Sequence, residues 1–119
     1  MKKNFFALMF VVTIFFANTC AAQDVWVDHW GGSDNVDIYV MDDTIVPNSS
    51  RDGFSVVTKQ VRNGQILKTI KWNFYNVRGS WRYSAGNSSH DNIVYNSKIF
   101  EFCMNQLGWS YNKDKGYYN

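Results

Sequence analysis

The chain has 119 residues, including 12 Lys or Arg, 10 Asp or Glu and an aromatic share of 18%. This length suits one small domain, and aromatic side chains bury enough area to help fill its core. Lys2 and Lys3 lie in the first 22 residues and every acidic residue lies after them, so residues 23–119 carry ten basic and ten acidic side chains. A formally neutral domain lacks the positive excess that nucleic-acid binding needs, and we expect no nucleic-acid partner.

The first 22 residues have the order of a bacterial secretory signal. A basic start, Met1–Lys3, precedes an apolar run over residues 5–17 and the small-residue exit Cys20–Ala22. A run of about thirteen residues is too short to cross a bilayer, which needs about 20. We therefore expect cleavage after Ala22, export to the periplasm or outer surface of a diderm bacterium, and no stable membrane insertion afterwards.

Lipidation at Cys20 is the competing interpretation of this signal. The residues before it, Ala17-Asn18-Thr19, match poorly the Leu-small-small pattern of a bacterial lipoprotein signal. Removal of residues 1–22 would leave Cys103 as the one cysteine of the mature domain, and we expect it to be buried.

The first strands follow directly after the expected cleavage point. Asp24–Trp30 alternates with period two, which predicts a strand with Val25 and Val27 on one face and Trp26, Asp28 and Trp30 on the other. A Gly-rich turn over residues 31–35 leads to a second strand, Val36–Met41, with Val36, Ile38 and Val40 on one side. We expect Asp42-Asp43 to end this strand and Pro47–Gly53 to form a loop.

Asn63-Gly64 predicts a β-hairpin between Phe54–Arg62 and Gln65–Val77. A bare two-residue turn would place Lys59 opposite Lys68, which is a destabilising like-charge pair. We therefore expect a bulge at Gly64 that shifts the pairing by one residue. This register would place a set of apolar side chains on one face: Phe54, Val56, Ile66, Ile70, Trp72 and Phe74. A fifth strand, Ser80–Ser84, would carry Trp81 and Tyr83.

A helix is expected over about residues 96–107, after a polar loop at Ala85–Asn92. Apolar residues recur at three- and four-residue spacing: Ile99, Phe100, Cys103, Met104 and Leu107. Asn96-Ser97 can cap its start and Gly108 can end it. We expect the tail from Trp109 to Asn119 to be loosely held. The expected fold is α+β, an antiparallel meander of about five strands with the C-terminal helix packed on one face.

The titratable residues suggest no particular chemistry. Five acidic side chains lie in or beside turns, without the spacing of a calcium loop: Asp34, Asp37, Asp42, Asp43 and Asp52. His29, His90 and Cys103 lack the short spacing of a zinc site. Ser88, His90 and Asp91 are neighbours in sequence, whereas the members of a catalytic triad converge in space. We expect no metal, no cofactor and no enzyme, with a hydrolase built around His90 and Asp91 as the least favoured function.

Exposed aromatic and basic side chains are the remaining candidates for binding. Trp, Tyr and Arg dominate the energy of many interfaces, and aromatic rings can stack on sugars. The candidate binding residues are Trp30, Tyr39, Arg82 and Tyr83. The alternative for the tryptophans is a place in the core, which is the favoured interpretation of Trp72 and Trp81.

With these motifs in view, the chain resembles a group of small exported proteins of diderm bacteria, mostly uncharacterised. The resemblance rests on Asp24–Val27, on the Tyr-Val-x-x-Asp segment that opens Tyr39–Val46, on Val61–Gly64 and on Phe102-Cys103-Met104. More distantly it is similar to the surface-adhesin protein E family. That resemblance implies a small β-sheet domain with a C-terminal helix, and it suggests adhesion because some members of the family bind host extracellular proteins. The mature domain would lack a second cysteine, so it has no bridge to the helix, and no binding residue carries over.

The sequence therefore favours an exported, non-enzymatic binding or adhesion-like module of the bacterial envelope. The alternative is a soluble periplasmic accessory protein or inhibitor that acts on an envelope partner. The ligand would be a protein or a glycan. An edge strand could pair with a second chain, so we expect a monomer or a weak dimer.

Overall fold

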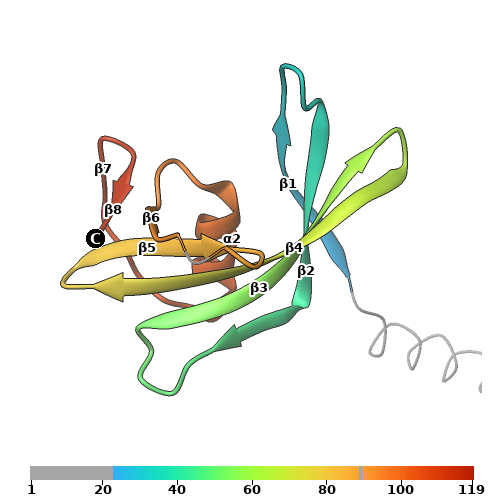
Figure 1. The fold of residues 1–119 in the computed structure, drawn as a ribbon. Helices are drawn as coiled ribbons and strands as arrows, with labels where there is room; N and C mark the ends of the chain where they lie inside the picture. Colours follow the sequence, from blue (N-terminus) through green and yellow to red (C-terminus); the bar gives the residue numbers. More distant parts are fainter. Residues whose placement is uncertain (1–22, 89) are drawn as a thin grey trace, which may run out of the picture.

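The computed structural model describes residues 23–88 and 90–119, so the expected signal at 1–22, its cleavage after Ala22 and lipidation at Cys20 lie outside the described residues. Six strands form one antiparallel sheet in sequence order, and one helix, α2, packs against it (Figure 1). The strands of this sheet are β1 (Asp24–Trp30), β2 (Val36–Pro47), β3 (Gly53–Arg62), β4 (Gln65–Val77), β5 (Ser80–Ala85) and β6 (Asn92–Ile93). The predicted α+β meander is confirmed, with six strands in place of about five.

Strand β1 is one edge of the sheet and contains a bulge. Trp26 pairs with Tyr39 whereas Asp28 pairs with Ile38, so Val27 is an extra residue without its own partner. A bulge breaks the period-two alternation. Trp26 therefore lies on the outer face and is 53% exposed, while Trp30 packs against the core. The prediction that Trp26 shares a face with Asp28 and Trp30 is wrong for this reason.

Strand β2 continues past Asp42-Asp43, where we expected it to end. Its pairing with β3 resumes at Val46 and Pro47 after an irregularity. Thr44 bridges this irregularity, since its hydroxyl donates to the carbonyl of Met41 (2.6 Å) and accepts from the N–H of Val57 (2.9 Å). The side-chain bonds hold the backbone in the sheet where the regular ladder is interrupted. The inward row of Val36, Ile38 and Val40 is confirmed, and all three are buried.

The β3–β4 hairpin has the predicted register from Gly53 to Gln60, but beside the turn the strands are unshifted because the bulge lies elsewhere. Asn63 and Gly64 form a two-residue turn with φ of 52° and 76°, which is the geometry of the turns that favour Asn-Gly. The extra residue lies beyond the turn at Leu67, and from there Lys59 pairs with Thr69 rather than with Lys68. Ile66 is consequently opposite Val61 on the outer face, 57% exposed, so its predicted place is wrong. Of the other five residues, Phe54 pairs with Phe74 and Val56 with Trp72, and Ile70 pairs with Thr58 on the same face, as expected.

Helix α2 (Lys98–Leu107) lies against the inner face of the sheet. The Ser97 hydroxyl caps it by accepting from the N–H of Phe100 (3.1 Å), and Gly108 ends it with a φ of 70°. Phe100 is fully buried and its ring contacts those of Phe54, Phe74 and Trp81. Cys103 is also buried, as predicted, and burial raises the pKa of its thiol to about 12. In the part of the chain that the structure describes, no helix has the length and apolar character to cross a membrane.

The C-terminal tail is part of the core, contrary to the prediction. It forms a small hairpin of β7 (Lys113–Asp114) and β8 (Tyr117–Tyr118), and Tyr118 is 1% exposed. The Tyr118 hydroxyl accepts from the Ser97 N–H (3.0 Å) and donates to Glu101 (2.5 Å). Lys113 also donates to Glu101 (3.0 Å). The hairpin is thereby fastened to the first turn of α2.

Candidate functional site

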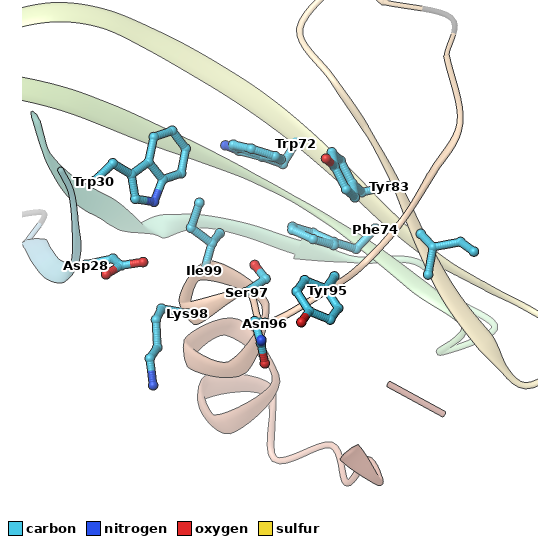
Figure 2. A pocket seen from close by; sticks show the side chains of 11 residues that line it. Asp28, Trp30, Trp72, Phe74, Tyr83, Tyr95, Asn96, Ser97, Lys98 and Ile99 are labelled. Carbon is cyan, nitrogen blue, oxygen red and sulfur yellow. The ribbon is translucent and has the colours of Figure 1, made fainter. Parts of the chain in front are cut away.

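A hollow of about 400 Å³ opens between the inner face of the sheet and the first turn of α2 (Figure 2). The sheet contributes Asp28 and Trp30 from β1, Trp72 and Phe74 from β4, and Tyr83 from β5; Ile93, Tyr95, Asn96, Ser97, Lys98 and Ile99 complete the lining. In Figure 2, Trp30 and Asp28 lie at one end, Tyr83 and Tyr95 lie at the other, and Ile99 lies between them. The volume is within the range of about 300–1,000 Å³ that is usual for small-molecule sites.

Three rings form a continuous aromatic wall on the sheet side. The centroids of Trp72 and Phe74 are 6.0 Å apart with nearly parallel planes, at 11°. Tyr83 packs against both, with its centroid 5.4 Å from Trp72 and 6.1 Å from Phe74. The Trp72 indole N–H donates to the buried Thr58 hydroxyl (2.8 Å), which fixes the orientation of the ring. The wall is thus held rigidly by its own packing and by one hydrogen bond.

Tyr95 is held at the hollow by the C-terminal hairpin. It forms an isolated bridge with Tyr117, and their rings lie 5.0 Å apart. The Asn96 N–H donates to the carbonyl of Gly116 (2.8 Å). Gly116 has a φ of 90°, and a Cβ placed there would lie 2.4 Å from the Tyr95 ring. Only glycine gives the Tyr95 ring room at this position.

The polar groups around the hollow include several without a protein partner. Across residues 23–88 and 90–119, no protein hydrogen bond occupies the Trp30 indole N–H or the Tyr83 and Tyr95 hydroxyls, while the Lys98 side chain extends away from the hollow (Figure 2). The Oδ1 atom of Asp28 accepts a hydrogen bond from the N–H of His29 (2.8 Å). Its second carboxylate oxygen, Oδ2, can accept a hydrogen bond from a ligand. The hollow therefore offers both donors and acceptors to a ligand.

The four predicted binding residues divide between the two faces of the sheet. Trp30 and Tyr83 both line the hollow, at its opposite ends. Tyr39 lies on the outer face, opposite Trp26 and Lys59 in the neighbouring strands. Arg82 pairs with Tyr75 in the ladder and also lies on the outer face. The structure therefore does not bring the four together.

Arg82 forms a hydrogen-bonded cluster with Asp91 and Tyr75 on the outer face. Its Nε donates to Asp91 (2.8 Å), and the Tyr75 hydroxyl donates to the same carboxylate. Two hydrogen bonds hold the pKa of Asp91 below its ordinary value. The bond from Tyr75 has the larger effect, and the bond from Arg82 has a smaller one. Asp91, which the hydrolase hypothesis pairs with His90, is thus bonded to two other side chains.

Polar side chains elsewhere on the outer face pair in the same way. Asp37 accepts from the Trp26 indole (3.0 Å) and lies 3.0 Å from His29 Nδ1. The hydrogen bond from Trp26, and then that from His29, lowers the pKa of Asp37. Lys59 donates to Asp24 across the strands (2.6 Å). Among the described residues, no three His, Cys, Asp or Glu side chains gather into a metal-binding group.

Sequence reasoning missed several residues of the hollow. The sequence predicts a core position for Trp72, and the side chain does pack against the core, but it also lines the hollow. Tyr95 and Lys98 carry no local signal, because the helix start and the C-terminal hairpin bring them to the site only through tertiary contacts.

Comparisons with protein-family models, with curated proteins and with solved structures gave no match. A function for the hollow is therefore inferred from its geometry and its polar groups.

Proposed function

We propose that this protein is an exported, non-enzymatic, adhesion-like binding module of the bacterial cell envelope, and that the hollow beside Trp30 and Tyr83 is its binding site. The observation that carries the proposal is a rigid aromatic wall facing a hollow of about 400 Å³ with unpaired polar groups at its rim. Binding sites for small ligands are usually concave, largely apolar and supplied with a few polar groups that orient the ligand. Export is supported by the order of charges and apolar residues in positions 1–22.

Two tryptophans of β1 provide a matched test of the site. Trp30 lines the hollow, and Trp26, four residues earlier on the same strand, lies on the outer face. The purified protein and the variants Trp30→Ala and Trp26→Ala would be titrated onto surfaces coated with isolated bacterial envelopes or with host extracellular matrix. We expect Trp30→Ala to weaken binding at least about tenfold and Trp26→Ala to leave it unchanged. Equal binding by all three proteins would contradict the proposed site.

The location of the protein separates adhesion from the periplasmic alternative. Intact cells would be treated with external protease, and the released and retained fragments would be identified by mass spectrometry. We expect release of peptides from residues 23–119, as for a surface module. Full retention of a protein that begins at Gln23 would instead support a soluble periplasmic accessory protein or inhibitor acting on an envelope partner.

A further inference from the structure

We infer that the hollow binds an uncharged saccharide, with the apolar face of one sugar ring against the aromatic wall. This inference rests on the proposed function, since it names the ligand of the same site. Three observations lead to it: the shape of the aromatic lining, the mixture of polar groups, and the position of the hollow on the sheet.

The aromatic lining suits a flat ligand that is apolar on one side. Trp72, Phe74 and Tyr83 pack into one wall, and Trp30 stands apart from them beyond Ile99 (Figure 2). The axial C–H groups of a pyranose form an apolar face, and aromatic rings offer them a negatively polarised surface. Trp72 cannot turn away from such a ligand without breaking its hydrogen bond to Thr58.

The polar groups at the rim disfavour a negatively charged ligand. The Asp28 carboxylate points toward the hollow and would repel an anion, whereas the Lys98 side chain extends away from the hollow (Figure 2) and does not offset this repulsion. The indole N–H of Trp30 is a donor only, whereas the hydroxyls of Tyr83 and Tyr95 can donate and accept. Sugar hydroxyls also donate and accept, so a single saccharide can satisfy groups of all these kinds.

The position of the hollow disfavours a peptide. Peptides bound in extended form usually add a strand to an open sheet edge, where main-chain groups pair with main-chain groups. The hollow instead opens on a face of the sheet, between β1, β4, β5 and α2. A peptide bound there would leave much of its backbone without protein partners, which costs free energy on binding.

The test follows the indole N–H signals in two-dimensional NMR spectra of the ¹⁵N-labelled protein. The probes are glucose, galactose, N-acetylglucosamine and maltose; glucose 6-phosphate serves as the charged comparison and N-acetyltryptophanamide as the peptide-like one. We expect at least one neutral sugar to shift the Trp30 signal saturably and to leave Trp26 in place. Glucose 6-phosphate should bind more weakly than glucose.

Variants that keep the shape of the hollow test whether the Tyr83 hydroxyl and the Asp28 carboxylate bind the sugar. Tyr83→Phe removes one hydroxyl and Asp28→Asn removes one charge, and each should weaken sugar binding about threefold to tenfold. Trp26→Ala is the matched control and should bind as the parent protein does. Melting curves recorded on every variant show whether the fold is retained.

The possible outcomes separate this inference from the proposed function. Saturable sugar shifts at Trp30 that weaken in Tyr83→Phe support both. A response of Trp30 to N-acetyltryptophanamide but to no sugar would overturn the saccharide and leave the hollow as a binding site. If no probe moves Trp30 and Trp30→Ala binds envelopes and matrix normally, then both the ligand class and the site are wrong.

Discussion

The two faces of the sheet differ in whether their polar side chains have hydrogen-bond partners within the protein. On the outer face two clusters of polar groups satisfy one another, Trp26–Asp37–His29 and Tyr75–Asp91–Arg82. On the inner face, beside the hollow, Trp30 and Tyr83 have polar atoms for which the described residues provide no partner. Exposure of aromatic residues in the sequence therefore does not by itself mark a binding surface. The presence or absence of intramolecular partners is the better guide.

The largest expected effect concerns the packing of the inner face. Phe100 contacts aromatic rings from β3, β4, β5 and β8 and is fully buried. Phe100→Ala should lower the free energy of unfolding by about 3–5 kcal/mol, which is a large part of the stability of a small domain. Urea denaturation measures this loss. Leu107→Ala, at a half-buried position of the same helix, should cost less, and equal losses would refute this account of the core.

A pair of glycines tests how the hollow is shaped. Gly116→Ala and Gly64→Ala both place a side chain at positive φ, which costs about 1–2 kcal/mol. At Gly64 the new methyl group meets no atom within 4 Å, whereas at Gly116 it collides with the Tyr95 ring. Because Tyr95 is 56% exposed and its ring can turn aside, the added cost should stay below the roughly 1–3 kcal/mol of an overpacked core. Gly116→Ala should also shift the NMR signals of residues that line the hollow. Equal destabilisation by the two variants would show that Tyr95 is not held by the hairpin.

Acid should loosen the link between the C-terminal hairpin and α2. Burial acts to raise the pKa of Glu101, but the hydrogen bonds from Tyr118 and Lys113 outweigh it and hold the pKa below the ordinary 4.5. A lowered pKa in the folded state gives stability that is complete above pH 4.5 and is lost as the pH falls from 4.5 through the lowered value. We expect Glu101→Gln to flatten this part of the stability–pH curve, as measured by thermal unfolding. Tyr118→Phe should flatten it partly, and an unchanged curve in Glu101→Gln would contradict the assignment.

The smallest effect is expected on the outer face. Asp37→Asn keeps the shape of the side chain and removes the charge that faces Trp26 and His29. Hydrogen bonds between exposed groups exchange readily with water, so the thermal midpoint should move little. A loss as large as that of Gly116→Ala would mean that the outer face is as tightly organised as the inner one.

Local chemistry in the sequence was enough to predict most of the elements. Asn63-Gly64 predicts its hairpin because few other pairs adopt two successive positive φ angles. Ser97 and Gly108 predict the ends of α2, and the like-charge argument at Lys59 predicts the register of the long strands. Each of these features depends on residues that are close in sequence or directly paired.

Features that depend on distant contacts were not predictable. The bulge at Val27 determines which tryptophan of β1 lines the hollow. No glycine lies at this position in the sequence, so nothing local predicts the bulge. Tyr118 is buried because Ser97 and Glu101 bind its hydroxyl, about twenty residues away in sequence. For the same reason, sequence reasoning found Trp30 and Tyr83 but grouped them with Tyr39 and Arg82, which the pleat of the sheet turns to the other face.

The buried thiol of Cys103 can report how often helix α2 separates from the sheet. The side chain is inaccessible, and a pKa of about 12 leaves almost no thiolate at neutral pH while the domain is closed. Alkylating reagents attack the thiolate, so modification at Cys103 requires the helix to separate from the sheet. In the domain of residues 23–119, where Cys103 is the one cysteine, the rate of labelling at its sulfur therefore measures how often the core opens.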